Sequence, residues 1–276
     1  MDVSNVVVLA RKEFRDALRN RWFLFYAAVF TILALGLSYL ALSGAGMGGL
    51  AGFGRTSASL INLVLLIVPL MGLTAGATGL AAERERGTLT TLLAQPVSRA
   101  EVFLGKALGL ALALLASLGL GFGVAGVALA AGGGGGDATA YLALAGMAVL
   151  LAFAALALGL LISALARRSA VALGMAVVLW LGMVFVGELG LMGTTVVMKL
   201  RAGELLALAL LNPLQVFKMA AVLALRATPE VLGPAGLYAA DVMGQWLLPA
   251  LVGLLAVWVA LPTAAAYVVF CRSEEA

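Results

Sequence analysis

Long apolar runs alternate with short polar segments along all 276 residues of the chain. Some runs are long enough to span a membrane, since a helix needs roughly 20 apolar residues to cross about 30 Å of hydrocarbon. The six that qualify are 22–43, 58–82, 103–131, 140–166, 170–192 and 246–270. Each is predicted to be a helix, because an open strand would leave backbone groups unpaired in lipid. The pattern predicts an all-α integral membrane protein with six transmembrane helices, and residues 1–276 form a single transmembrane domain.

Composition agrees with a lipid environment and excludes most site chemistry. Hydrophobic residues make up 64% of the chain, and the mean hydropathy is +1.14, whereas soluble domains have roughly 45–50% apolar residues even with glycine counted. There is no histidine, and the single cysteine, Cys271, excludes an internal disulfide. We therefore expect no cofactor and no enzymatic activity. An intramembrane enzyme ranks low, because the spans lack paired aspartates, a metal motif or a serine with a base.

Two features near residue 190 suggest chemistry but have simpler explanations. Glu188 is the only acid in a predicted span, yet it lies about 30 Å from Arg168 at 1.5 Å per residue, near an interface where the span can end. Met192 and Met198 are the one methionine pair worth testing as Cu(I) ligands, since thioethers suit that ion. The other methionines are scattered, as packing residues are.

The distribution of Lys and Arg predicts the orientation in the membrane. Of the 17 basic residues, twelve lie in 1–21, 83–106, 167–168 and 271–276, and five lie in the alternate connections. Cytoplasmic loops carry the excess of basic residues, so both termini are predicted to be in the cytoplasm of a multi-pass inner (plasma) membrane protein. This bias explains the net charge of +4 without a nucleic-acid partner.

The stretch "ERERGTLTTLLAQPVSRAE" (83–101) is the most polar loop of the chain. Glu83, Arg84, Glu85 and Arg86 mark the end of the second span, and Gly87 allows a turn. From Thr88 the apolar positions Leu89, Leu92 and Leu93 follow the i, i+3, i+4 spacing of one helical face, and Pro96 ends the helix. Ser98 and Glu101 form a capping box for the next helix. The spacing predicts a short amphipathic helix over 88–95, about 12 Å long.

This short helix has two interpretations. Its leucines can rest on lipid at the membrane surface, as interfacial helices do. Interfacial helices usually carry basic residues, however, and this one has threonines in their place, which leaves a protein partner open.

Two further segments lie outside the spans. Residues 1–21 predict an amphipathic helix on the cytoplasmic face, in which Phe14 and Leu18, with Trp22 and Phe25 beyond, share a face. The connection 193–245 holds two short apolar arms, within 204–225, broken at Asn212-Pro213. Such arms are too short to span a bilayer and favour an outer re-entrant hairpin. The five glycines 132–136 are followed by Asp137 rather than Lys, so they are expected to be a linker and no P-loop.

The run "ERERGTLTTLLAQPVSRAEVFLGK" (83–106) resembles the characteristic loop of ABC-2 type permeases. "ARKEFRDALRNRWFLFY" (10–26) is similar to the amphipathic N-terminal helix of that family, and "LNPLQ" (211–215) to its outer hairpin. Within the family, the N-terminal segment and the short loops most resemble the permeases that serve nitrous-oxide-reductase maturation.

The resemblance implies a homodimer whose subunits each bind a separate ABC ATPase, with a coupling helix at 88–95 seated in a groove of the ATPase. It implies export or conformational work across the membrane driven by the partner's ATP hydrolysis. The alternative is a scaffold that passes ATPase motion to an outer-side accessory protein without moving a solute. The resemblance assigns three sets of site residues. The coupling loop has Glu83, Arg84, Glu85, Arg86, Gly87, Thr88, Leu89, Leu92, Leu93 and Pro96. The N-terminal helix has Arg11, Lys12, Phe14 and Arg15, and the outer hairpin has Asn212 and Pro213.

Overall fold

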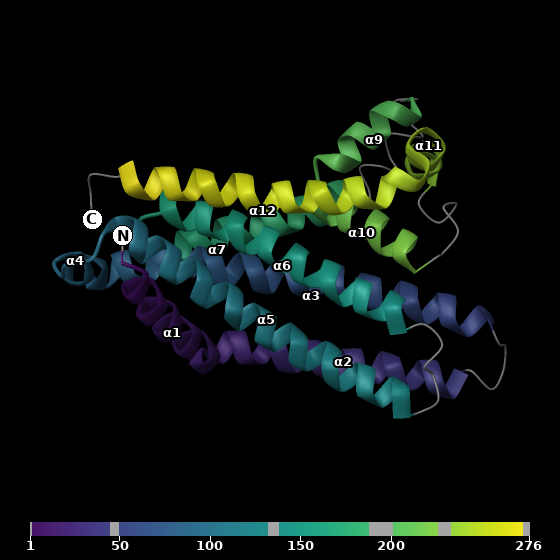
Figure 1. Cartoon of the computed structure of the whole chain (residues 1–276), viewed down its shortest axis with the longest axis horizontal. Helices are drawn as coiled ribbons and strands as arrows, with labels where there is room; N and C mark the ends of the chain where they lie inside the picture. Colours follow the sequence, from purple (N-terminus) through teal and green to yellow (C-terminus); the bar gives the residue numbers. More distant parts are fainter. Residues whose placement is uncertain (1, 45–49, 132–137, 188–200, 226–232, 273–276) are drawn as a thin grey trace.

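The computed structural model describes residues 2–44, 50–131, 138–187, 201–225 and 233–272, and these ranges contain helices and no strand. The long helices run side by side along one axis (Figure 1). In chain order the helices are α1 (Val3–Arg19), α2 (Arg21–Gly44), α3 (Leu50–Glu85), α4 (Thr88–Leu93), α5 (Arg99–Ala131), α6 (Ala138–Leu165), α7 (Ser169–Phe185), α9 (Ala202–Leu210), α10 (Pro213–Ala224), α11 (Gly233–Met243), the 3-10 turn η4 (Gly244–Trp246) and α12 (Leu247–Arg272).

The all-helical membrane architecture is confirmed at the level of its spans. Five helical segments of the described chain are long and apolar enough to cross a membrane, and they correspond to α2, α3, α5, α6 and the α11–α12 region. The predicted spans 22–43, 58–82, 103–131, 140–166 and 246–270 fall on these helices. The start of α1, the helix α4, the turn between α6 and α7 and the last residues of α12 lie at one end of the bundle, which we name the α4 end (Figure 1).

The predicted span 170–192 is described only in part. Its helix α7 has 17 residues, or about 25 Å at 1.5 Å per residue, which falls short of the roughly 30 Å hydrocarbon core. Two residues of π-helix follow it, Val186 and Gly187. Glu188, Met192, Met198 and the glycine run 132–136 lie outside the described residues.

Close contacts fix which faces of the long helices meet. A Cβ atom added to Gly76 of α3 would lie 2.5 Å from the carbonyl oxygen of Leu156 in α6, and one added to Gly109 of α5 would lie 2.5 Å from that of Ala10 in α1. Both positions therefore require the missing side chain for backbones to approach, as small residues do between membrane helices. The same spacing at Gly119 and Gly123 meets nothing within 4 Å, so the pattern alone does not identify a contact.

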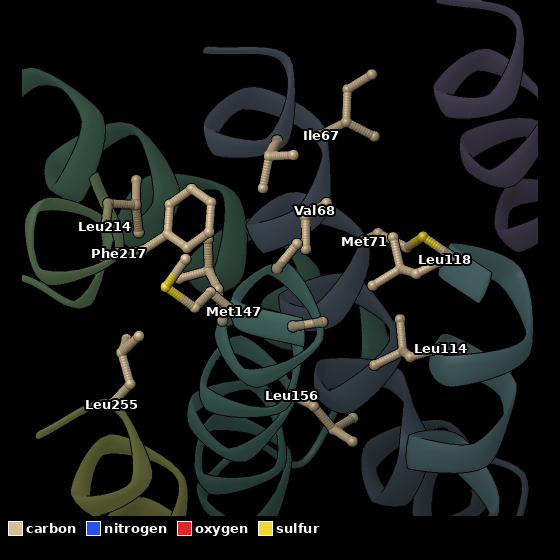
Figure 2. Close-up of a cluster of buried hydrophobic side chains, with 14 of the residues drawn as sticks. Ile67, Val68, Met71, Leu114, Leu118, Met147, Leu156, Leu214, Phe217 and Leu255 are labelled. Atoms are coloured by element: carbon tan, nitrogen blue, oxygen red, sulfur yellow. The ribbon is translucent and has the colours of Figure 1, made fainter. Parts of the chain in front are cut away.

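A continuous apolar core links α3, α5, α6, α10 and α12 (Figure 2). Val68 and Met71 of α3 lie in this core with Leu118 of α5 and Leu151 of α6, each at most 1% exposed. Phe217 of α10 is also fully buried in it. The short helix α10 is therefore part of the interior of the bundle rather than a surface appendage.

The predicted break at Asn212-Pro213 is present as a bend of 109° between α9 and α10. The side chain of Asn212 accepts the backbone N–H of Leu214 at 3.0 Å and so caps α10, whose first residue is Pro213. Its amide nitrogen donates to the carbonyl oxygen of Met183 at 2.6 Å, near the end of α7. The bend is thus held both by the local cap and by a contact with α7.

Candidate functional site at the α4 end of the bundle

The turn between α3 and α4 depends on one glycine. Gly87 has φ of +69°, in the left-handed region that glycine adopts without steric cost. The hydroxyl of Thr88 donates to the carbonyl oxygen of Glu83 at 3.3 Å, and that of Thr90 donates to the carbonyl oxygen of Gly87 at 2.6 Å. These bonds close the turn and set α4 across the end of α3.

The helix α4 spans Thr88–Leu93, two residues less than the predicted 88–95. Leu89 is only 1% exposed and belongs to the apolar core, and Leu92 is partly buried against it. Leu93 has a side chain outside the described part of the structure. The predicted leucine face therefore points, at Leu89, into the chain itself, and in this conformation that residue contacts neither lipid nor a partner. Among the α4 residues whose side chains the structure describes, Thr88, Thr90 and Thr91 are exposed.

Arg84 ties the end of α3 to the end of α6. Its Nη1 atom donates to the carbonyl oxygen of Ala166 at 2.7 Å and lies 3.4 Å from that of Ala164. The last carbonyl groups of a helix have no partner within the helix and carry partial negative charge. A guanidinium group at this place both satisfies and stabilises the end of α6.

Glu85 ties the same segment to the start of α7. One of its carboxylate oxygens, Oε2, accepts the backbone N–H of Ser169 at 3.0 Å and also the hydroxyl of Ser169. Ser169 is the first residue of α7, and its N-cap, Arg168, makes no side-chain capping bond. A carboxylate from α3 therefore supplies the anionic cap that the sequence around α7 lacks.

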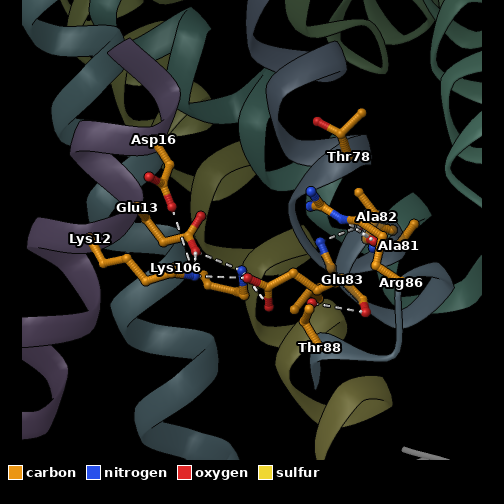
Figure 3. Close-up of polar contacts among 12 residues, drawn as sticks. Lys12, Glu13, Asp16, Thr78, Ala81, Ala82, Glu83, Arg86, Thr88 and Lys106 are labelled. Carbon is orange, nitrogen blue, oxygen red and sulfur yellow. Dashed lines mark hydrogen bonds and ion pairs between the residues drawn. The ribbon is translucent and has the colours of Figure 1, made fainter. Parts of the chain in front are cut away.

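An ion cluster of Lys12, Glu13, Glu83 and Lys106 joins α1, α3 and α5 (Figure 3). The ammonium of Lys106, a residue only 1% exposed, lies 2.8 Å from Oε1 of Glu13 and 2.9 Å from Oε2 of Glu83. Lys12 lies 3.1 Å from Oε1 of Glu83 and 3.4 Å from Oε1 of Glu13. Two carboxylates thus balance two ammonium groups, as buried charges require.

The partly exposed member of the cluster responds to its neighbours. Burial alone would lower the pKa of Lys12, but the carboxylates of Glu83 and Glu13 outweigh it and raise the pKa above its usual value. Lys12 therefore stays charged throughout the neutral range and holds α1 to the end of α3.

Glu101 joins the start of α5 to the start of α1. Its Oε2 accepts the backbone N–H of Ser98 at 3.0 Å, while its own N–H donates to the Ser98 hydroxyl at 3.3 Å. This is the predicted capping box. The same carboxylate accepts the N–H of Asp2 at 2.6 Å and the side-chain amide of Asn5 at 3.2 Å. The cap of one helix is therefore also the anchor of another.

The N-terminal helix packs differently from the prediction. Its buried residues Val6, Leu9, Ala10, Glu13 and Ala17 form the face that contacts α5. Phe14 is half-buried, and Arg11 and Arg15 are exposed. Phe14 and Leu18 pack partly buried against the core, but the expected face does not continue to Trp22 and Phe25. The helix ends at Arg19 and a new one begins at Arg21, which leaves Trp22 71% exposed.

Glu13 and Lys106 belong to this site although the sequence pattern did not predict them as site residues. The sequence does contain an indication of this site. Glu13 interrupts an apolar stripe at helical spacing, and because charged residues are almost never fully buried unless paired, a glutamate at that position indicates a buried ion pair. What the sequence could not supply was the pairing, since the partners are 93 positions apart along the chain.

A cavity of about 680 Å³ adjoins the ion cluster between α1, α2, α3, α5 and α7. Its polar lining includes Glu13, Asp16, Glu83, Arg86 and Thr78, and its other lining residues include Phe23, Tyr26 and Leu110. Among the residues that the structure describes, no group of three acidic, histidine or cysteine side chains could hold a metal ion.

These contacts make the α4 end a connected unit. Residues of the 83–101 segment bind α1 through Glu83 and Glu101, α6 through Arg84 and α7 through Glu85. The segments on either side of α4 are therefore bound to helices that lie far from them along the chain.

Comparison with known sequences identifies the family. The profile of a family described as "ABC-2 family transporter protein" matches residues 7–274. A "Probable ABC transporter permease protein NosY" from Stutzerimonas stutzeri is 37% identical over 107 residues, which cover 39% of this chain and 39% of the relative. A protein of the same description from Pseudomonas aeruginosa PAO1 is 38% identical over 104 residues, 38% of each chain. The matched region thus spans about two fifths of these relatives.

Proposed function

Since the chain belongs to the ABC-2 family of transporter proteins, we propose that it is the membrane subunit to which an ABC ATPase couples through the 83–101 loop. The observation that carries this is the set of contacts of Arg84 and Glu85. They join the segment before α4 to the end of α6 and the start of α7. Motion applied by an ATPase at α4 then reaches the spanning helix α6 and the shorter apolar helix α7.

The surface offered to the ATPase is the threonine side of α4. Thr88, Thr90 and Thr91 are exposed, whereas Leu89 is buried within the chain. Threonines donate and accept hydrogen bonds and add little hydrophobic attraction to lipid. This supports a protein groove rather than the membrane surface as the neighbour of α4.

The α4 end is proposed to be cytoplasmic. Twelve of the 17 basic residues lie in segments at this end, namely 1–21, 83–106, 167–168 and 271–276. An ATPase needs cytoplasmic ATP, so the charge bias and the position of α4 agree. On the opposite side the α9–α10 hairpin is proposed to re-enter the membrane, supported by its 109° bend and the burial of α10.

The resemblance to NosY over part of the chain supports a role in copper or nitrous-oxide-reductase maturation, with a homodimer of this chain and two ATPases as the working unit. Under this proposal ATP is hydrolysed by the partner and the chain carries out no covalent chemistry. Flux of a solute into reconstituted vesicles separates transport from purely mechanical work on an outer-side protein.

Association with the ATPase tests the proposal. Thr91 is exposed and its side chain makes no hydrogen bond within the described structure, so Thr91→Arg leaves the fold intact while placing a bulky charge in the groove. We expect the variant to insert normally but to lose most of the co-purifying ATPase. Gln245→Arg, at an exposed position at the far end of the bundle, is the matched control. Equal ATPase recovery from both variants would contradict the proposal.

A further inference from the structure

The cavity beside the ion cluster is open and has both polar and apolar walls. Its volume of about 680 Å³ falls in the range of sites for small molecules, about 300–1,000 Å³. The ion cluster closes one side, where Glu13, Glu83 and Lys106 already satisfy one another. The groups left to meet a ligand are those at the rim.

Two charged residues of opposite sign stand at that rim. Asp16 of α1 is exposed over 56% of its side chain, and its only ion pair in the described chain is with Lys12 at 3.8 Å. Arg86, just beyond α3, donates its Nε–H to the carbonyl oxygen of Ala82 at 3.0 Å. Among the described residues, its terminal guanidinium nitrogens have no hydrogen-bond partner. Asp16 and Arg86 lie on opposite sides of the Lys106–Glu83 pair (Figure 3).

The charges around the cavity cancel. The lining holds three acids, Glu13, Asp16 and Glu83, and two basic residues, Arg86 and Lys106. Lys12 is outside the lining but lies within ion-pair distance of all three acids, so it balances the remaining negative charge. A site with no net charge does not concentrate a simple anion or cation. It suits a group that carries both signs at once.

The depth of the cavity matches one leaflet of a bilayer. It extends along α3 from Arg86 to Thr74, which is eleven residues before Glu85 and thus about 16 Å from the helix end at 1.5 Å per residue. Half of a hydrocarbon core is about 15 Å. The inner walls carry Leu110, Leu173 and Val177, and Phe23 and Tyr26 lie near the start of α2.

Aromatic residues line the part of the cavity away from the ion cluster. Trp22 and Tyr26, in the first two turns of α2, belong to this lining. Phe30 of α2 lies beside Gly121 of α5, whereas the ion cluster meets α5 at Lys106. The rim charges therefore lie at the α4 end of the cavity, and the aromatic and apolar walls lie farther along the bundle.

We propose that this cavity binds a zwitterionic phospholipid with a primary amine headgroup, of the phosphatidylethanolamine class, from the leaflet at the α4 end. The ammonium of the headgroup donates to Asp16, the phosphate accepts from Arg86, and an acyl chain lies along α3 and α7. The lipid would then fill the space between the N-terminal helix and the spans that the coupling loop moves. The inference goes beyond the coupling role and holds even if α4 binds no ATPase.

Lipid retention tests this site. The full chain is reconstituted in nanodiscs with equal amounts of phosphatidylethanolamine, phosphatidylcholine and phosphatidylglycerol, then extracted gently and analysed by native mass spectrometry. We expect phosphatidylethanolamine to be retained about tenfold over phosphatidylcholine, whose ammonium cannot donate a hydrogen bond, a ratio typical of one charge-assisted hydrogen bond. Equal retention of the three lipids would overturn the proposal. Retention of none of them, as expected if a second subunit covers this face, would also overturn it.

Variants and a soluble competitor sharpen the result. Asp16→Asn and Arg86→Gln, both at exposed positions, should each lower phosphatidylethanolamine retention about tenfold. The matched controls Asp241→Asn and Arg272→Gln, exposed residues away from the cavity, should not change it. Glycerophosphoethanolamine, which has the headgroup without acyl chains, should fail to displace the lipid at equal concentration. Displacement at equal concentration would assign the site to a soluble headgroup and contradict a lipid site, and unchanged retention in Asp16→Asn and Arg86→Gln would also contradict it.

Discussion

Lys106 of α5 and Glu83 of α3 form an ion pair of 2.9 Å in which the lysine is only 1% exposed. Glu83 opens the polar loop that follows the second predicted span, and Lys106 lies near the start of the third. The pair therefore closes the loop 83–101 at its base, and Glu13 of α1 completes it at 2.8 Å from Lys106. Breaking it should loosen the attachment of α1 as well as that of the loop.

We expect Lys106→Met to destabilise the protein by about 3 kcal/mol, because it leaves the Glu13 and Glu83 carboxylates buried with only Lys12 beside them. Thermal unfolding in detergent measures the effect. The triple variant Lys106→Met, Glu13→Gln, Glu83→Gln should recover part of the loss, since no unpaired carboxylate remains. A loss in the triple variant that equals the sum of the single losses would show that the three groups act independently.

Gly87→Ala should lower the free energy of unfolding by about 1–2 kcal/mol, because the left-handed region is less favourable by about this amount for a residue with a Cβ. A Cβ at Gly87 meets nothing within 4 Å, so the effect comes from φ alone. Gly119→Ala is the control, since its Cβ also meets nothing and its φ is not positive; it should be neutral or slightly stabilising. Equal stabilities of the two variants would mean that the turn is not constrained.

Glu85→Ala should loosen the start of α7, because the N–H of Ser169 loses its anionic acceptor. Hydrogen exchange followed by mass spectrometry should show severalfold faster exchange in residues 168–172. Arg86→Ala changes the next residue, which does not contact α7 through any hydrogen bond of the described structure, and should leave this exchange unchanged. Faster exchange in both variants would point to general loosening of the loop.

Asn212→Asp separates the two roles of Asn212 at the α9–α10 bend. The aspartate still caps α10 through its oxygen but cannot donate to the carbonyl oxygen of Met183. Because a buried carbonyl then faces a carboxylate, we expect a larger loss of thermal stability than for Asn212→Ser, which retains a capping oxygen without adding charge. If both variants have wild-type stability, the contact with α7 does not hold the bend.

Much of the fold could be predicted from the sequence, because lipid permits few solutions. The length of each apolar run determines a helix. Four predicted spans therefore match their helices within four residues, and the fifth, 58–82, lies inside the longer helix α3 (Leu50–Glu85). The end of α4 was less certain, since local spacing favoured 88–95 whereas the structure ends it at Leu93. The bend at Asn212-Pro213 could be predicted because proline breaks a helix through its own missing N–H and ring, without any tertiary partner.

Tertiary partners could not be predicted in the same way. The charges of "ERER" look like the boundary of a span, yet Glu83, Arg84 and Glu85 each bind a different part of the bundle. Leu89 belongs to a helical apolar stripe, but the stripe does not say whether lipid, a partner or the chain itself covers it. The structure assigns Leu89 to the core of the chain.

If motion of α4 reaches α7 through Arg84 and Glu85, a label on α7 reports it. In a Cys271→Ser background, a cysteine at Val171, an exposed position on α7, is alkylated in vesicles that contain the chain and its cognate ATPase. We predict that ATP changes the alkylation rate with wild-type Arg84 and Glu85. In Arg84→Ala/Glu85→Ala we predict no change, although the ATPase remains bound and hydrolyses ATP. An equal ATP response at Val171 in both proteins would contradict the account.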